Sequence, residues 1–197
     1  MFDLPEIGIR LRGFQGDKDL DQIMLMENDR EIATLMTIHF LVPQGEQTRE
    51  LYKKNIAEHT EMFCIIETIP PTLAEAQSEV TAVPEFVGFV GLFAGPDRGQ
   101  RLSMLSIAFV KKFWNKGYGT AVVKFVVDYA FRNLNMHRIS LGTTEGNDRA
   151  IAVYKKCGFV LEGRDRKNHW VDGGWKDLIR MGIIIDDWIE MNKKEKA

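Results

Sequence analysis

The stretch FVKKFWNKGYGTAVV at residues 109–123 constrains the fold most, because it joins a predicted strand directly to a predicted buried helix. Over residues 120–132, polar side chains recur only at every fourth position, which is typical of a helix that exposes one narrow stripe. Gly117 and Gly119 allow successive backbone N–H groups to turn toward one point where this helix begins. The turn is either an anion-binding site or a tight connection between strand and helix, and the residues alone leave both interpretations open.

The overall charge excludes several classes of partner. The 197 residues include 26 Lys and Arg against 28 Asp and Glu, so no global positive field exists to hold nucleic acid or an anionic membrane. Lys111, Lys112 and Lys116 nevertheless place three positive charges beside the glycine turn, which favours a ligand with phosphates. A hydrophobic content of 45% at this length indicates one domain, residues 1–197, with a sizeable core.

The cysteines, the histidines and the length of the apolar runs indicate which kinds of protein this chain is not. Cys64 and Cys157 supply neither a metal cluster nor a disulfide framework, and the four histidines are scattered without a metal-binding motif. No apolar run approaches the roughly 18 residues of a membrane-spanning helix. We therefore expect a cytoplasmic protein without a bound metal and without nucleic-acid or membrane partners.

Hydrophobic periodicity predicts helices and strands along the whole chain. Strands are predicted at 7–11, 62–69, 86–94, 102–110 and 137–145, with two more flanking a glycine-rich turn at 172–174. Helices are predicted at 17–28 and 46–59, between Asn147 as N-cap and Gly158 as stop, and around Trp188. The turn residues at 95–100 indicate a hairpin of 86–94 with 102–110. Prolines and small polar residues predict an exposed insertion loop at 70–85.

The strand at 102–110 has an irregular pattern. Leu102 and Met104 keep one alternation, whereas Leu105, Ile107 and Phe109 keep the other. A β-bulge near residues 104–106 accounts for the change of phase, and so does a strand buried on both faces.

Two common phosphate motifs are absent. The sequence contains no G-x-x-x-x-G-K-[ST], and Val122 stands where a dinucleotide fingerprint requires Gly or Ala. There is also no G-x-S-x-G, which argues against that type of serine hydrolase.

A predicted strand is followed by KKFWNKGYGTA at 111–121, a buried helix, a second strand and NDRAIAVYKKCGF at 147–159. These two sequence motifs and the elements around them resemble the GNAT superfamily of acyl-CoA-dependent N-acetyltransferases. The resemblance is strongest over residues 86–185 and is closest to the group of ribosomal-protein N-terminal and spermidine acetyltransferases. It implies an α/β domain of the α+β type, with a mixed, largely antiparallel sheet flanked by helices and a splayed or bulged strand near 102–110.

The resemblance also implies the residues that bind acetyl-CoA, the only cosubstrate expected. Backbone groups of Ile107, Ala108 and Phe109 are expected to meet the acetyl and pantetheine end. The pyrophosphate is expected on the glycine turn formed by Asn115, Lys116, Gly117, Tyr118, Gly119 and Thr120. Asn147 and Arg149 match cofactor-contacting positions, although helix capping accounts for Asn147 equally well. Trp114 begins the turn where many relatives have Gln or Arg.

Catalytic roles follow from the same resemblance. Tyr154 matches the position that protonates the leaving thiolate, and a phenol with a pKa of about 10 can do so if it lies against the sulfur. A tyrosine packed in the core explains the same pattern. Some relatives place a glutamate base at the position of Gly142, so Glu145 is a candidate substitute, with Glu67 or a water chain as alternatives.

We therefore expect an enzyme that transfers acetyl from acetyl-CoA directly to a primary amine of a small molecule, a polyamine or a peptide N-terminus. The alternative is a non-catalytic acyl-CoA-binding or sensor module. Since relatives are often dimers, a homodimer is one alternative for this chain, although no exposed apolar stripe in the sequence requires it. Cys157 is expected in the core and not as an acyl carrier.

Overall fold

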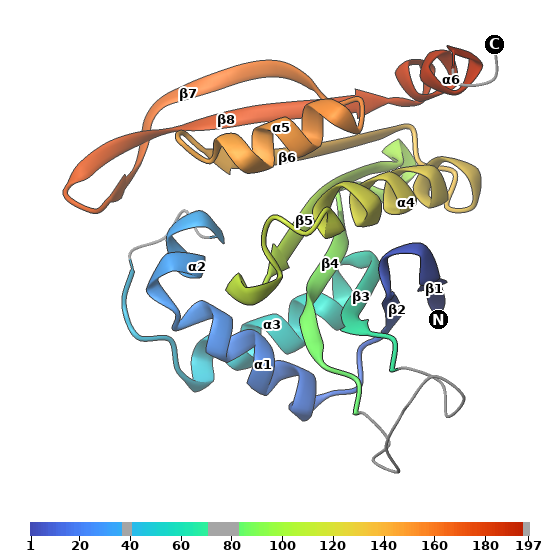
Figure 1. Ribbon diagram of the computed structural model, residues 1–197. Helices are drawn as coiled ribbons and strands as arrows, with labels where there is room; N and C mark the ends of the chain where they lie inside the picture. Colours follow the sequence, from blue (N-terminus) through green and yellow to red (C-terminus); the bar gives the residue numbers. More distant parts are fainter. Residues whose placement is uncertain (37–40, 71–82, 195–197) are drawn as a thin grey trace.

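The protein is described by a computed structural model over residues 1–36, 41–70 and 83–194 (Figure 1). Its strands are β1 (Phe2–Leu4), β2 (Ile9–Gly13), β3 (Thr60–Thr68), β4 (Phe86–Ala94), β5 (Leu102–Phe109), β6 (Arg138–Thr144), β7 (Val160–Val171) and β8 (Gly174–Ile184). They form one sheet in the order β1-β2-β3-β4-β5-β6-β8-β7. Within the described residues β5 and β6 are the only parallel neighbours, so the sheet is mixed and largely antiparallel, as predicted.

Helices cover both faces of this sheet. They are α1 (Asp17–Glu27), α2 (Arg30–Met36), α3 (Glu46–Glu58), α4 (Tyr118–Arg132), α5 (Asp148–Lys156) and α6 (Ile185–Lys194). Buried side chains of α4 and the end of α5 belong to one apolar cluster, whereas buried side chains of α1 and α2 belong to a second, with Tyr52 of α3 against it. Figure 1 shows the same division, with α1, α2 and α3 gathered away from α4 and α5.

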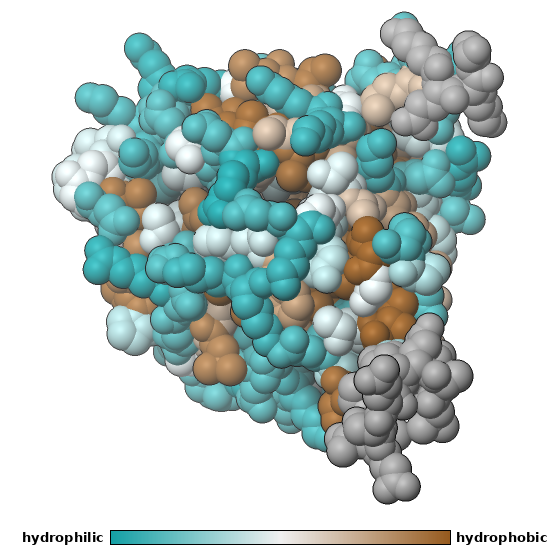
Figure 2. All heavy atoms as spheres, in the orientation of Figure 1, coloured by the Kyte–Doolittle hydropathy of each residue, from teal (hydrophilic) through white to brown (hydrophobic). Residues whose placement is uncertain are grey.

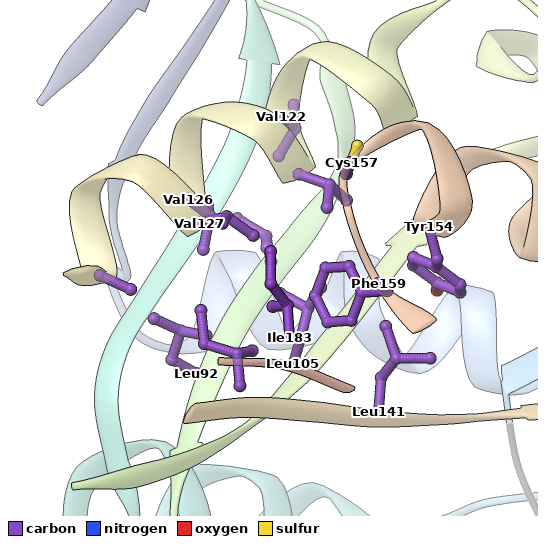
Figure 3. Close-up of a cluster of buried hydrophobic side chains, with 14 of the residues drawn as sticks. Leu92, Leu105, Val122, Val126, Val127, Leu141, Tyr154, Cys157, Phe159 and Ile183 are labelled. Carbon is purple, nitrogen blue, oxygen red and sulfur yellow. The ribbon is translucent and has the colours of Figure 1, made fainter. Parts of the chain in front are cut away.

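The larger cluster forms because α4 is apolar on most of its circumference. Val126 and Val127 lie on the side of α4 toward Leu92 of β4 and Leu105 of β5, and Val122 belongs to the same cluster (Figure 3). Burying an aliphatic side chain of this kind stabilises the folded state by about 1.5–3 kcal/mol. Of the predicted polar stripe, Lys124 and Arg132 are exposed and Asp128 is partly exposed, in an ion pair with Arg132.

From Ser103 to Phe109, β5 keeps one unbroken register with β4, so the bulge interpretation is wrong. Burial on both faces is found only toward the end of the strand, where Ala108 is buried on the face opposite Leu105, whereas Met104 is 53% exposed. Leu105, Ile107 and Phe109 pack with the cluster of α4, whereas Ala108 packs with the cluster of α1 and α2. The predicted splay is present, since β5 pairs with β6 only from Leu102 to Met104. Beyond Met104 the two strands diverge, and this opening positions the site.

Other local predictions are confirmed. Gly158 follows α5 with φ of 91°, a left-handed conformation that favours glycine at a helix end. β7 and β8 form the predicted hairpin about the turn at 172–174. The insertion predicted at 70–85 lies mostly outside the described residues, but its flanks are joined by backbone hydrogen bonding of Thr68 to Glu85.

The surface shown in Figure 2 is largely hydrophilic, with hydrophobic residues scattered among polar ones. None of the helices in the described ranges combines the length and the apolar character needed to cross a membrane.

Candidate active site

A cavity of about 1050 Å³ opens where β5 and β6 diverge. Its walls come from β5, the turn before α4, one side of α5, the last residue of α1, part of α2 and one side of α3. The structure brings twelve of the thirteen predicted site residues to this cavity: Ile107, Ala108, Phe109, Asn115, Lys116, Gly117, Tyr118, Gly119, Thr120, Asn147, Arg149 and Tyr154. Glu145 is the exception.

The edge of β5 presents unpaired backbone groups to this cavity. Val110 N–H donates to the Val87 carbonyl of β4, whereas the carbonyl of Ser103 accepts from Ser140 of β6. Alternate residues of a strand direct their polar backbone groups to opposite sides. Ile107 and Phe109 therefore direct theirs toward the opening, where β6 no longer pairs, and of these groups the Phe109 carbonyl accepts a hydrogen bond from Trp114. Ala108 lines the cavity, but its peptide groups point toward β4.

The turn before α4 forms an anion-binding N-terminus. Gly117 is the N-cap with φ of 83°, Asn115 has φ of 59°, and no side chain caps the helix. The first backbone N–H groups of an α-helix have no partner within the helix, which here leaves those of residues 117–120 available. The dipole of this 15-residue helix adds partial positive charge at the same point. These groups fit the pyrophosphate of a coenzyme A thioester.

Among the residues that the structure describes, three with cationic side chains line the cavity, namely Lys116, Arg149 and Lys156. The guanidinium of Arg149 lies 4.5 Å from the ring centroid of Trp114. The expectation that all three turn lysines serve an anion is corrected: Lys111 pairs with Glu31 and Lys112 with Glu85, and neither lysine lines the cavity.

Asn147 caps α5 as predicted. Its Oδ1 accepts a hydrogen bond of 3.4 Å from the backbone N–H of Ala150. Because Asn147 also lines the cavity, capping and ligand contact are compatible at this residue.

Tyr154 projects from α5 beside Phe159 and Leu141 (Figure 3). Burial raises the pKa of Tyr154 to about 12, with a smaller contribution from Cys157. The phenol is therefore protonated throughout the neutral range. No described residue hydrogen-bonds its hydroxyl, although the side chain lines the cavity, so the hydroxyl is available to a ligand.

The carboxylates considered as bases lie elsewhere. Glu145 accepts hydrogen bonds from Arg164 at 2.9 Å and from the backbone N–H of Asp177 at 3.3 Å. Glu67 forms a 2.7 Å ion pair with Arg12. Neither glutamate lines the cavity, because both are held by arginines on other parts of the sheet.

Two features of the site were missed by the sequence analysis. Glu27, at the end of α1, is the single carboxylate among the described cavity residues, and it accepts a hydrogen bond from the hydroxyl of Tyr52 on α3. The indole Nε1 of Trp114 donates to the carbonyl of Phe109 at 2.8 Å. The contact of Trp114 with Phe109 is five residues apart and overlaps the recognised motif, so the sequence could have suggested it. Nothing in the sequence links Glu27 to Tyr52, which is 25 positions away.

Cys157 lies in the core as expected and does not line the cavity. It is 3% exposed, and its Sγ lies 3.6 Å from the carbonyl oxygen of Thr120. Burial raises the pKa of Cys157 to about 11, so the thiol stays protonated and is a poor nucleophile.

Comparison with known proteins identifies the family to which this geometry belongs. The family model described as Acetyltransferase (GNAT) domain matches residues 9–160, more than half of the chain. The chain belongs to the GNAT acetyltransferase family. This GNAT protein is 25% identical over 177 residues to spermidine N(1)-acetyltransferase of Vibrio cholerae, covering 89% of this chain and 92% of the relative. It is 26% identical over 128 residues to the putative ribosomal N-acetyltransferase YdaF of Bacillus subtilis, covering 62% and 70%.

A solved structure extends the likeness to three dimensions. The crystal structure of the Vibrio cholerae spermidine N-acetyltransferase in complex with CoA and spermine matches with a TM-score of 0.75 at 25% identity, covering 92% of this chain and 98% of that one. The GNAT protein is an acetyl-CoA-dependent N-acetyltransferase, and the alternative of a non-catalytic binding module is not favoured. The described residues contain no cluster of three His, Cys, Asp or Glu side chains that could hold a metal ion.

Proposed function

We propose that acetyl-CoA lies with its pyrophosphate on residues 115–120 and its thioester beside Ile107 and Phe109, and that the acceptor is the primary amine of a small molecule. One observation carries this proposal: the uncapped N-terminus of α4 and the edge of β5 that no longer pairs with β6 both line the same cavity. Arg149 and Lys116 supply the positive charge that a coenzyme with several phosphates requires.

The transfer step follows from this arrangement. A backbone N–H at the open edge of β5 polarises the thioester carbonyl, a type of electrostatic stabilisation that often dominates catalysis. The amine nitrogen attacks the carbonyl carbon, the new C–N bond forms, and the C–S bond breaks. Tyr154 donates its proton to the departing thiolate, while the proton lost by the amine passes to a chain of water molecules. No acyl-enzyme is needed, which agrees with the buried, protonated Cys157.

Three classes of acceptor are candidates: a polyamine, a peptide N-terminus and a small amine. A polyamine acceptor is supported by the spermidine acetyltransferases among the relatives, and a peptide N-terminus by the relative described as ribosomal. A small amine is supported by the limited volume of the cavity, about 1050 Å³, whose far end is formed by residues of α1, α2 and α3.

The test combines binding and turnover in one sample. Acetyl-CoA is titrated into the protein by calorimetry, then monoamines, spermidine and a short peptide are added and free thiol release is followed. Binding of acetyl-CoA and thiol release with a small amine support the proposal. Failure to bind at about millimolar acetyl-CoA, or release only with the peptide, contradicts it.

A further inference from the structure

Two buried side chains of the cavity lining carry a hydroxyl group, as counted over the residues that the structure describes. The other buried lining residues among them are apolar: Ile32, Phe89, Leu105, Ala108, Phe113 and Val123. One hydroxyl belongs to Tyr154, which is proposed as the proton donor. The other belongs to Thr143 of β6, which is only 5% exposed and has no role in the proposed transfer.

The Thr143 hydroxyl has no hydrogen-bond partner among the described residues, whereas Oγ1 of the adjacent Thr144 lies 3.2 Å from His169 Nε2. In the described part of the chain, His169 Nδ1 is the one fully enclosed side-chain atom without a partner. Thr143 Oγ1 therefore keeps accessible surface, and the space that this residue lines is the cavity. A hydroxyl taken out of water without a partner is disfavoured, so a polar group of a ligand stabilises it.

Thr143 lies on the same face of the sheet as the cluster that contains Tyr154. It pairs with Ile179 of β8 and follows Leu141 by two residues along β6, and cross-strand partners and alternate residues share a face. Leu141 and Ile179 pack in one cluster with Tyr154, and Figure 3 shows Tyr154 beside Leu141. Both hydroxyls therefore face the cavity from the side of α5.

The register between β5 and β6 places Thr143 at the level proposed for the thioester. The last parallel pair is Met104 with Ser140. Three residues further along each strand are Ile107 and Thr143, which stand level on the two sides of the opening because both strands rise by the same distance per residue. Since the thioester is proposed beside Ile107, Thr143 lies across the opening from it.

We propose that Thr143 binds acetyl-CoA through its hydroxyl, which forms a hydrogen bond with the amide of the pantetheine arm nearest the thioester. This inference rests on the proposed function. The N–H and C=O groups of an extended amide point to opposite sides, and the edge of β5 reaches only one side of the arm. A threonine hydroxyl both donates and accepts, so it pairs with either group on the other side. Thr143 and β5 thus hold the arm between them and keep the thioester beside Ile107.

Calorimetry separates the arm of the coenzyme from its nucleotide. Acetyl-CoA, CoA and 3′-phospho-ADP, which lacks the arm, are titrated into the protein and its variants. Thr143→Val replaces the hydroxyl by a methyl group of similar size. It should weaken binding of acetyl-CoA and CoA by about threefold to tenfold, the effect of one neutral hydrogen bond, and leave binding of 3′-phospho-ADP unchanged. Thr143→Ser, which keeps a hydroxyl, should retain most of the affinity.

Thermal unfolding without ligand distinguishes this role from a structural one. Because the Thr143 hydroxyl has no partner in the described chain, Thr143→Val should keep or raise Tm while it weakens coenzyme binding. A hydroxyl that stabilised the fold would lower Tm when removed. Thr144→Val is the matched control, because Thr144 is similarly buried on the opposite face of β6 and does not line the cavity. It removes the contact with His169, so Tm should fall while acetyl-CoA affinity stays unchanged.

Rates of thiol release give a third readout. Since a hydrogen bond to the arm is present both before and during transfer, Thr143→Val should raise the KM for acetyl-CoA by the same factor as its dissociation constant. The kcat should change by less than about twofold. Thr143→Ala also removes the hydroxyl and should show the same pattern, so the test does not depend on how valine packs.

The inference is overturned if both variants without the hydroxyl bind acetyl-CoA as tightly as the unchanged protein, or if they lose affinity for 3′-phospho-ADP equally. It is also overturned if kcat falls while affinity is kept, since the hydroxyl would then act in the chemical step. If the unchanged protein binds 3′-phospho-ADP as tightly as acetyl-CoA, the arm is not held and Thr143 has no such role, while the pyrophosphate site stands. A protein that binds none of the three ligands overturns the proposed function and this inference together.

Discussion

The indole Nε1 of Trp114 donates a 2.8 Å hydrogen bond to the carbonyl oxygen of Phe109, which ties the turn before α4 to the last residue of β5. The face of the same indole ring carries the guanidinium of Arg149, from the first turn of α5. Trp114 thus connects the three segments that surround the proposed pyrophosphate and thioester positions. It holds the carbonyl group of Phe109, the residue whose own N–H is among those proposed to face the thioester.

Trp114→Phe should weaken acetyl-CoA binding by about threefold to tenfold, the usual net effect of one neutral hydrogen bond. Phenylalanine keeps an aromatic face for Arg149 but removes the donor to Phe109. Calorimetry with acetyl-CoA measures the change. Trp170→Phe is the control, since Trp170 is 44% exposed on β7 and does not line this cavity. Equal affinities in both variants would show that the Phe109 carbonyl does not need this donor.

Tyr154→Phe should lower kcat by about 100-fold to 10,000-fold, the range for loss of a general acid, while acetyl-CoA affinity stays within about twofold. The substitution removes one oxygen and preserves the packing against Phe159. Rates of thiol release with a saturating amine measure the effect. A variant with unchanged kcat would assign Tyr154 to the core alone.

The pKa of Tyr154 adds a pH signature to the same role. Since burial raises this pKa to about 12, the phenol keeps its proton below that value. The kcat of the unchanged enzyme should therefore show no decline between about pH 8 and pH 10 from loss of this proton. A decline in that range that is absent from Tyr154→Phe would contradict the assignment.

Gly88→Ala should destabilise the protein by about 1–3 kcal/mol and weaken acetyl-CoA binding. Gly88 pairs with Phe109, and a Cβ at this position would overlap the carbonyl oxygen of Ala108 and lie 3.0 Å from Cα of Phe109. The neighbouring backbone would have to move away from β4, which would shift the strand edge that faces the cavity. Urea unfolding and calorimetry measure the two effects. Gly13→Ala is the control, because its Cβ would meet nothing within 4 Å.

The features that could be predicted from the sequence are those that depend on residues close together along the chain. The turn before α4 and the buried character of that helix depend on neighbouring residues, so glycines and a four-residue polar repeat were sufficient to predict them. The seven residues of α2 bury only Ile32 and Ala33, which is too short a signal to detect. The sequence left two explanations for the phase change in β5 open, because an apolar residue at an exposed position, Met104, looks the same in the sequence as a buried one.

The acceptor end of the site shows the same limit. Glu27 and Tyr52 meet only after α1 and α3 pack together, a contact set by tertiary structure. Glu145 was a reasonable candidate by its position at the end of β6, but Arg164 and the backbone of Asp177 hold its carboxylate outside the cavity. Proximity along the chain did not reveal which carboxylate lines the cavity.

His169 should make the protein less stable as the pH falls below about 6.5. It is 5% exposed on β7, its Nε2 lies 3.2 Å from Thr144 Oγ1, and its Nδ1 has no partner among the described residues. Burial lowers the pKa of His169 from 6.5, so between the two values the unfolded chain binds a proton that the folded chain does not. Stability from the neutral imidazole is complete above pH 6.5 and is lost as the pH drops through this window.

Thermal unfolding between pH 7.5 and pH 5 measures this loss, and His169→Gln should show a smaller fall in Tm over the same range. The window is separate from that of Asp3, Asp165 and Asp177, whose arginine or backbone partners hold their pKa values below 3.8. His59→Gln is the matched control, because the His59 side chain is 58% exposed. If Tm falls by the same amount in His169→Gln and in the unchanged protein, protonation of His169 does not govern stability in acid. The contact between His169 and Thr144 would then tolerate a charged imidazole.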